Sequence, residues 1–436
     1  MKWKISKSTF LAYTFVFNSL LFFGRPGVAQ DEYSFDMSVY EKTPFEFGGY
    51  SELRWEHARL NTDTAIYQLN IFDGTQPETN NRYTATLQLE GRYQQDAVTA
   101  YVRLNPTAFK DDFSDHSESE VHEAYLSWQA KSSLALDVGK KLIKWGKGYA
   151  WNPVGFIERP KDPNEPDLAR EGFTVVSGDW IKSLAGDLQT ISVTPVFLPV
   201  TENINKDFGP QDDNFAGRVY LLYKDTDIDF LFLSQGSRAA RYGLDFSRNI
   251  SNNFEMHGEW AYINDVDRLL IDNQGNKTTQ TEDVISWLLG LRYLTENDTT
   301  YIAEYYHNGA GFTEDQMRVF YQLVEDAPFQ PDVDVAFNAV RNLANAGFVS
   351  QNVMRDYLYV RIMQKEPFDL LYVTPAITAI INVVDHSYNI APEVSYTGIN
   401  NLELRFKFNF LQGDEFSEFG EKLNDSKLEL RARYFF

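Results

Sequence analysis

The segment from Gly139 to Gly172 combines basic and aromatic side chains in a pattern that could bind a solute. Its lysines and arginines could meet carboxylate or phosphate groups through charge-assisted hydrogen bonds. Its aromatic rings could offer flat surfaces to a sugar or to another ring. The candidate contact residues are Lys140, Lys144, Trp145, Lys147, Tyr149, Trp151, Arg159, Lys161 and Arg170.

This segment also interrupts the pattern of the surrounding chain. Elsewhere most of the sequence consists of short alternating stretches, whereas here four prolines stop the alternation. A loop of this length is usually either functional or disordered, and its aromatic content argues against disorder. We therefore expect a structured loop whose role depends on the elements around it.

The first 29 residues have the features of a secretory signal peptide. Basic residues at positions 2, 4 and 7 precede an apolar stretch from Thr9 to Phe23, and small residues provide a cleavage site near Ala29. Because this segment holds four basic residues and no acidic one, its removal changes the formal charge from −22 to −26. We expect an exported, acidic chain, and this acidity argues against nucleic acid as a partner.

The composition favours a β-barrel over a secreted enzyme or a helical membrane protein. No later apolar run is long enough for a spanning helix. The absence of cysteine excludes disulfides and thiolate chemistry, while 15% of the residues are aromatic.

The C-terminal stretch Lys427–Phe436 shows the plainest alternation, with apolar residues on one face and Lys, Glu and Arg on the other. A soluble sandwich and a membrane barrel both produce such a pattern. The signal peptide, the aromatic excess and the final Phe436 favour the barrel. A last amphipathic strand ending in Phe also resembles the signature that marks bacterial outer-membrane proteins for assembly.

We predict an all-β fold, a transmembrane antiparallel up-and-down β-barrel over residues 45–436, preceded by a short periplasmic segment at 30–44. The count is eighteen strands, or sixteen if one hairpin is misread, and a barrel of this size leaves an aqueous lumen. The expected strands are 45–58, 82–94, 97–106, 120–130, 133–143, 171–182, 187–197, 214–224, 227–235, 240–249, 254–264, 283–294, 299–308, 356–365, 370–383, 387–397, 402–411 and 427–436. With both ends periplasmic, long extracellular loops fall near 61–80, 107–119, 144–170, 198–213, 265–282, 309–355 and 412–426.

Two of these loops could control the lumen. Loop 144–170 is the third extracellular loop, the one that folds into the barrel as a pore constriction in general porins. Loop 309–355 carries a capping box at Thr313 and Gln316 and a second helical stripe from about Asp332 to Ala346, ending at Gly347. This helical extracellular insertion is either a lid or plug over the mouth or a surface hairpin.

Alternation directs many charged side chains into the lumen. They could form ion pairs that stiffen the wall or a graded path for a charged solute. The bases of loop 144–170 could likewise pair with wall acids and pin the loop. Because the two signs nearly balance, no anion or cation preference follows. The basic lumen-lining candidates are Arg54, Arg92, Arg103, Arg218, Arg292, Arg361, Arg405, Arg431 and Arg433, and the acidic ones are Glu52, Glu56, Glu90, Glu123, Asp137, Glu255, Glu259, Glu304, Glu403 and Glu429.

The run LDVGKKLIKWGKGYAWNP, followed later by RPKDP and REG, resembles a motif of bacterial outer-membrane porin-like barrels. In that motif the fifth strand ends in G-[RK]-x4-W-G-x-G, with Asn-Pro and Arg-Glu-Gly downstream. The matching positions are Gly139, Trp145, Gly146, Gly148, Asn152, Pro153, Arg170, Glu171 and Gly172. The resemblance, akin to the alginate-export and specific-channel porins, implies an outer-membrane barrel and leaves its substrate open.

The sequence contains no arrangement typical of an enzyme. Its six histidines are scattered, and HExxH, GxSxG and Walker patterns are missing. No acidic loop has the ligand spacing of a calcium site, so we expect no metal and no cofactor.

We therefore expect an outer-membrane channel for passive diffusion of small hydrophilic solutes, anionic ones included. Its partners would be outer-membrane lipid, lipopolysaccharide, the barrel-assembly machinery and the solute. A polysaccharide or export outlet and a plugged structural or adhesion barrel are the alternatives. The oligomeric state stays open.

Overall fold

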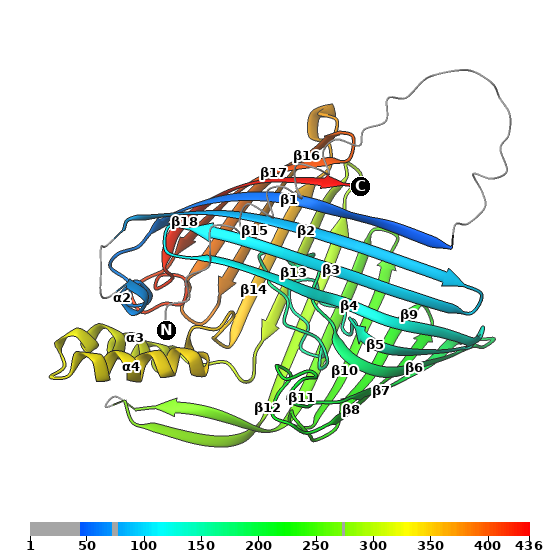
Figure 1. Ribbon diagram of the computed structural model, residues 1–436, viewed down its shortest axis with the longest axis horizontal. Coiled ribbons are helices and arrows are strands. Elements are labelled where there is room, and N and C mark those ends of the chain that lie inside the picture. Colours follow the sequence, from blue (N-terminus) through cyan, green and yellow to red (C-terminus); the bar gives the residue numbers. More distant parts are fainter. Residues whose placement is uncertain (1–43, 72–76, 273–274) are drawn as a thin grey trace, which may run out of the picture. The chain divides into compact units, whose positions relative to one another are not determined.

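The computed structural model describes residues 44–71, 77–272 and 275–436, which form a closed barrel of eighteen antiparallel strands (Figure 1). This confirms the predicted fold class and strand number. Each strand pairs with its neighbours in sequence, and β1 also pairs with β18 to close the ring. The predicted signal peptide and nearly all of segment 30–44 lie outside the described residues.

The strand bounds agree closely with the alternation in the sequence. The strands are β1 (Phe45–Leu60), β2 (Thr79–Gln95), β3 (Val98–Asp111), β4 (Asp115–Lys131), β5 (Leu134–Lys141), β6 (Phe173–Ser183), β7 (Leu188–Leu198), β8 (Asn214–Tyr223), β9 (Thr226–Leu233), β10 (Arg241–Ser251), β11 (Phe254–Ile271), β12 (Lys277–Leu294), β13 (Thr299–His307), β14 (Asp356–Gln364), β15 (Val373–Asn382), β16 (Tyr388–Ile399), β17 (Leu402–Gln412) and β18 (Asn424–Phe435).

The connections alternate between the two ends of the barrel. Most of those at one end, here called the turn end, are two to four residues long and mainly polar. Several place Asp or Asn in the left-handed region, as at Asp96, Asp225 and Asn401, because these residues tolerate the positive φ that tight hairpins need. The opposite end, the loop end, carries the longer connections.

The side chains of each strand alternate between the outer surface and the lumen. On β18 Leu430 is 44% exposed on the outside, whereas Arg431 on the next position forms ion pairs with other wall residues. On β17 Phe406 and Lys407 divide in the same way, with the lysine buried. The apolar outer face and the charged lumen follow from the period of two along a strand.

Two predicted loops are wrong, because the strands continue through them. β3 and β4 extend to Asp111 and from Asp115, so the expected loop 107–119 is reduced to a tight connection. β11 and β12 remain paired almost to their joining turn, which replaces the expected loop 265–282. These extensions carry polar residues on both faces, so their composition resembles that of a loop. They are strands because their backbones pair with each other.

Helices occur at the loop end. α2 (Ala65–Ile71), which was not predicted, lies between β1 and β2. The predicted pair between β13 and β14 is confirmed as α3 (Glu314–Asp326), with its capping box at Thr313 and Gln316, and α4 (Val333–Leu343), followed by a turn of π-helix to Phe348. No helix in the described ranges is long and apolar enough to span a membrane.

Candidate functional site

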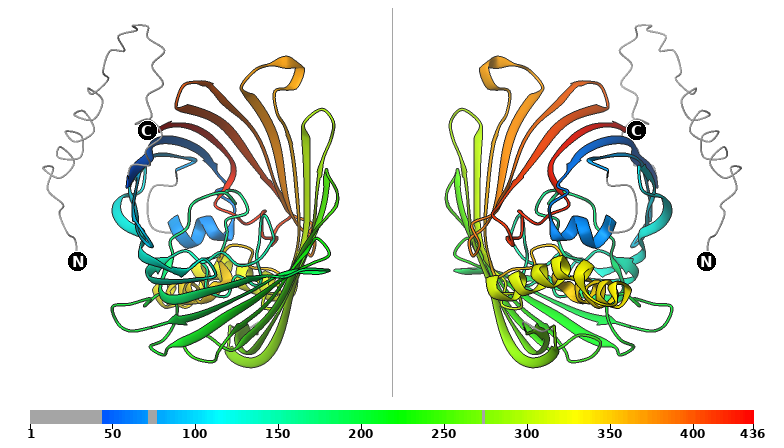
Figure 2. Two further views of the ribbon diagram at one scale, coloured as in Figure 1. Left: turned by 90° about the vertical axis from the view of Figure 1, so that its right-hand side faces the viewer. Right: turned by 90° about the vertical axis from the view of Figure 1, so that its left-hand side faces the viewer.

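Residues 142–172, which join β5 to β6, form a loop inside the barrel (Figure 2). We call this segment the inner loop. It contains no strand or helix, and its backbone is held by side chains from distant strands. The expected infolded third loop is therefore present, with bounds slightly wider than 144–170.

Buried carboxylates on β11 and β13 hold the first half of the inner loop. Glu259 accepts hydrogen bonds from the backbone N–H groups of Lys147 and Gly148, both at 2.6 Å, and from that of Val154 at 3.2 Å. Glu304 accepts from the N–H groups of Tyr149 and Ala150. Because both carboxylates are almost fully buried, these donors supply the polar partners that buried charges need.

The glycines of the WGKG sequence allow this close approach. Gly146 has a φ of +90°, and a Cβ there would lie 2.7 Å from Oε1 of Glu259. A Cβ on Gly148 would lie 2.0 Å from the carbonyl oxygen of Trp151. Any other residue would push the loop backbone away from the carboxylate, so the glycines serve the loop anchor directly.

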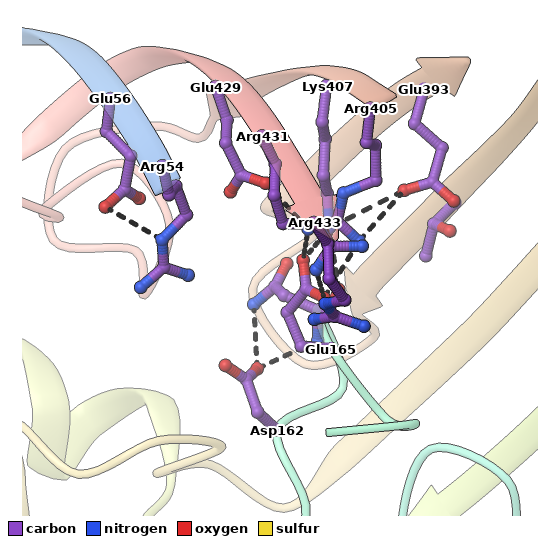
Figure 3. Close-up of polar contacts among 12 residues, drawn as sticks. Arg54, Glu56, Asp162, Glu165, Glu393, Arg405, Lys407, Glu429, Arg431 and Arg433 are labelled. Carbon is purple, nitrogen blue, oxygen red and sulfur yellow. Dashed lines mark hydrogen bonds and ion pairs between the residues drawn. The ribbon is translucent and has the colours of Figure 1, made fainter. Parts of the chain in front are cut away.

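The second half of the inner loop contacts a different part of the wall through Glu165 (Figure 3). This carboxylate pairs with Arg405 on β17 at 2.9 Å from Nη1, with Lys407 at 3.3 Å and with Arg431 on β18 at 3.6 Å. Lys407 also donates to the carbonyl oxygen of Asn164 at 2.6 Å. Burial opposes ionisation of Glu165, but Lys407, Arg405 and Arg431 outweigh it and lower its pKa to about 2.

The inner loop therefore crosses the lumen between two parts of the wall, and these bind it with groups of opposite charge. The acidic wall, defined by Asp229, Asp245, Glu259 and Glu304 on β9 to β13, binds its first half. The basic wall, defined by Arg405, Lys407 and Arg431 on β17 and β18, binds Glu165 (Figure 3). These cations also pair with carboxylates of the wall, which are Glu393, Glu403 and Glu429. Sequence alternation placed most of these residues in the lumen but did not reveal this segregation.

Most predicted contact bases of the inner loop pair within the protein. Lys147 lies 2.8 Å from Asp229 and 3.8 Å from Asp245 on the acidic wall. The remaining partners are Glu171 for Lys140, Glu171 and Asp207 for Arg159, the carbonyl oxygens of Gly148 and Tyr149 for Lys161, and Glu158 with the carbonyl oxygen of Arg159 for Arg170. Lys144 differs, because it is exposed and forms no ion pair with any described residue. The pairing alternative thus accounts for nearly all of these bases.

The two tryptophans do not present free faces to the lumen, which corrects the expectation that all three rings could contact a solute. Trp145 is 2% exposed in an apolar core with Phe173 and Leu198, and Trp151 is 4% exposed. Trp151 stacks on Tyr306 at 5.2 Å between ring centroids. Tyr149 is only partly buried, and its hydroxyl donates to Asp167 at 3.1 Å.

Most of the predicted lumen arginines belong to ion-pair networks along the wall. Arg92 and Arg292 differ, because neither pairs with a carboxylate of the described chain. The pairs are Arg54 with Glu56, Arg103 with Glu123, Arg218 with Asp229, Arg361 with Glu393, Arg405 with Glu429, Arg431 with Glu403 and Arg433 with Glu52. The wall is thus cross-linked by charge over much of the barrel.

Two cavities lie beside strands β2 to β8. One of about 590 Å³ is lined by Arg92, Tyr101, Tyr125 and Lys141 among others. The second, of about 580 Å³, is lined by Lys147 and Arg218 together with polar residues of β6 to β8. Gln129 borders both cavities, so they are neighbours. Open space lined partly by charged side chains therefore remains beside the inner loop.

At the loop end the helical insertion packs onto the inner loop. Met317 and Phe320 of α3 and Phe337 of α4 share one buried cluster with Trp151. The insertion is thus joined to the constriction by an apolar core, which differs from an independent surface hairpin.

The residues that hold the inner loop in place were not identified from the sequence. Glu165 and Asn164 were not singled out, and only the flanking prolines distinguish them in the sequence. Glu259 and Glu304 were expected in the lumen, yet nothing in the sequence links them to the loop more than 100 residues earlier. The described residues contain no group of three side chains suited to a metal ion.

Comparison with solved structures finds the same fold in other large barrels. OccK3 (OpdO) of Pseudomonas aeruginosa aligns with a TM-score of 0.50 and 10% identity over 90% of this chain and 96% of that chain. OccAB3 of Acinetobacter baumannii gives 0.50 and 10% over 90% and 99%. The sequence matches no protein-family model and no curated protein, so the likeness is one of fold alone.

Proposed function

We propose that this protein is an outer-membrane channel for passive diffusion of small hydrophilic solutes, anionic ones among them, with the inner loop as its constriction. The observation that carries the proposal is the fastening of the inner loop across the lumen of an eighteen-stranded barrel, by carboxylates of one part of the wall and by cations of another. A loop fastened in this way narrows the lumen without filling it, since cavities of about 590 and 580 Å³ remain beside it.

In this proposal the turn end faces the periplasm and the loop end faces the exterior. The apolar outer face meets outer-membrane lipid, and the loops meet lipopolysaccharide after insertion by the barrel-assembly machinery. A solute entering from the loop end passes the inner loop, where Lys144 is exposed, and then the cavities lined by Arg92, Lys141 and Lys147. Lys144 and Arg92 form no ion pair with a described carboxylate, and these two cations favour a solute that carries a carboxylate or phosphate group.

Planar-bilayer recording of the purified, refolded protein tests this function. Stepwise single-channel currents with a reversal potential that depends on the charge of the ions are expected. The absence of steps from correctly folded barrels would rule out the channel.

A plugged structural barrel is the second candidate. The buried core that joins α3 and α4 to Trp151 favours it, because this core occupies part of the loop end. Deleting residues 314–348 distinguishes the two candidates, since a plug predicts a large gain of conductance on deletion. A channel predicts current in the intact chain as well.

A further inference from the structure

The connection between β14 and β15 differs from every other described connection at the turn end. The other seven have two to four residues, whereas this one spans the eight residues between Gln364 and Val373. It exposes four large apolar side chains: Phe368 at 94%, Leu370 at 54%, Leu371 at 62% and Tyr372 at 52%. Figure 1 shows it as the orange coil at the top of the barrel. We call these four residues the apolar knob.

The backbone of this connection adopts an unusual conformation. Glu366, Phe368, Asp369 and Tyr372 have φ values of 50°, 54°, 60° and 66°, in the left-handed region. Asp tolerates this region, but bulky residues such as Phe and Tyr rarely occupy it. Strained conformations of this kind persist where they serve a function. Here the strained residues Phe368 and Tyr372 expose their apolar side chains and do not bury them.

Local hydrogen bonds hold the connection in this shape. The N–H of Tyr372 donates to the Glu366 carboxylate at 2.9 Å, and the N–H of Val373 donates to the carbonyl oxygen of Leu370 at 3.2 Å. The N–H of Glu366 donates to the carbonyl oxygen of Val373 at 2.9 Å. The knob is therefore a defined structure that presents its side chains to whatever lies outside the barrel.

The outer surface next to the knob indicates lipid as that surrounding. Ile377 on β15 is 42% exposed on the outer face, while its neighbour Thr378 faces the lumen beside Arg361. On β16 the outward Val394 and Tyr396 are 42% and 37% exposed. On the β15 side the apolar outer face thus runs from Ile377 through Pro375 and Val373 into the knob, whereas Gln364, Lys365 and Glu366 separate the knob from β14.

The short strands of this hairpin place the knob near the membrane boundary. β14 has 9 residues and β15 has 10, against 18 in β11 and β12. At about 3.3 Å per residue and a tilt of about 40°, these strands rise roughly 20–25 Å, about the height of the apolar band of such barrels. A connection that follows directly lies where acyl chains meet headgroups.

We propose that the apolar knob inserts into the lipid leaflet at the turn end and anchors this side of the barrel there. The proposal rests on the membrane placement in the proposed function but not on channel activity. The aromatic Phe368 and Tyr372 suit the headgroup boundary, and Leu370 and Leu371 suit the acyl chains below it.

The absence of cysteine from the chain allows a direct test. The Phe368→Cys variant is labelled with an environment-sensitive nitrobenzoxadiazole dye and reconstituted in phosphatidylethanolamine–phosphatidylglycerol vesicles. We expect blue-shifted emission, quenching by nitroxide on the acyl chains, and iodide quenching several-fold weaker than at the control Asn252→Cys in the polar β10–β11 turn. Equal iodide quenching at the two sites would overturn the proposal.

A second labelled position keeps the test independent of one variant. Leu371→Cys is expected to behave like Phe368→Cys, and correct folding is checked by the difference in gel migration between the unheated and the heated sample. If both labels are exposed in pure lipid but protected in native membranes, a protein covers the knob and the lipid anchor is wrong. Conductance measured on the same vesicles separates the two proposals, since loss of current with intact lipid quenching contradicts only the channel.

Discussion

The acidic wall and the basic wall hold the same loop by opposite means. On the acidic wall, Glu259 and Glu304 of the barrel accept hydrogen bonds from the loop backbone, which glycine brings close. Lys147 is the loop side chain that pairs there with Asp229 and Asp245. On the basic wall, a loop side chain supplies the carboxylate, and arginine and lysine of the barrel bind it.

As a result, one wall determines the path of the inner loop and the other determines the charge of the lumen. Backbone hydrogen bonds to Glu259 and Glu304 fix the path of the loop, whatever solute passes. The contact of Glu165 with Arg405, Lys407 and Arg431 sets how much positive charge the lumen presents, because Glu165 neutralises part of it. We expect the acidic wall to determine whether the constriction exists and the basic wall to determine which ions it favours.

Replacing Glu259 with alanine should have the largest effect on this comparison. Three loop N–H groups would lose their acceptor, and each buried N–H without a partner costs about 1–3 kcal/mol. We expect a larger, noisier single-channel conductance and a lower unfolding temperature. Glu259→Gln keeps one oxygen as a hydrogen-bond acceptor, so its conductance and unfolding temperature should lie between those of Glu259→Ala and wild type. Wild-type conductance in Glu259→Ala would show that the backbone contacts do not hold the constriction.

Lys147→Met should destabilise the acidic wall next most strongly. Asp229 and Asp245 are 1% and 0% exposed and would lose their nearest cation from the loop. Breaking a buried ion pair typically costs about 3–5 kcal/mol. Lys144→Met is the matched control, because this exposed lysine should change the stability by no more than about 0.5 kcal/mol. Urea unfolding of both variants measures the difference, and equal losses would contradict the assignment.

Glu165→Gln should alter selectivity more than stability. The change removes one negative charge among three cations and costs about 1.5–3 kcal/mol for charged hydrogen bonds. The reversal potential in a salt gradient should shift towards higher anion permeability. Asp167→Asn also removes one negative charge, at an exposed position of the loop, and should shift the reversal potential less. A shift of equal size in both variants would mean that Glu165 acts only through net charge.

The pH dependence of that shift should be the smallest and most specific effect. The Glu165 pKa of about 2 lies below the ordinary value of 4.5, so the folded protein binds this proton more weakly than the unfolded chain does. The contribution of Glu165 is therefore full above about pH 4.5 and is lost as the pH falls through about 2. Wild type and Glu165→Gln should differ in reversal potential at pH 4, and this difference should be halved near pH 2 and vanish below it. Convergence already at pH 4 would contradict the buried ion pairs.

The fold was predictable because its signal is local. Alternation over about ten residues predicted all eighteen strands, and the long gap after β5 predicted the loop that enters the lumen. The contacts of that loop were not predictable, since Glu165 and Arg405 lie 240 residues apart. Local pattern also failed for Trp145, whose burial depends on packing against β6 and β7 and not on its neighbours in sequence.

The wide spacing of the loop contacts has a consequence for the order of assembly. The inner loop is synthesised early, yet its partners on β11, β13, β17 and β18 become available only as the second half of the barrel forms. Contacts of such high sequence separation form late and slowly. The lumen therefore acquires its constriction only as the ring closes, and an incompletely closed barrel would present an unrestricted passage.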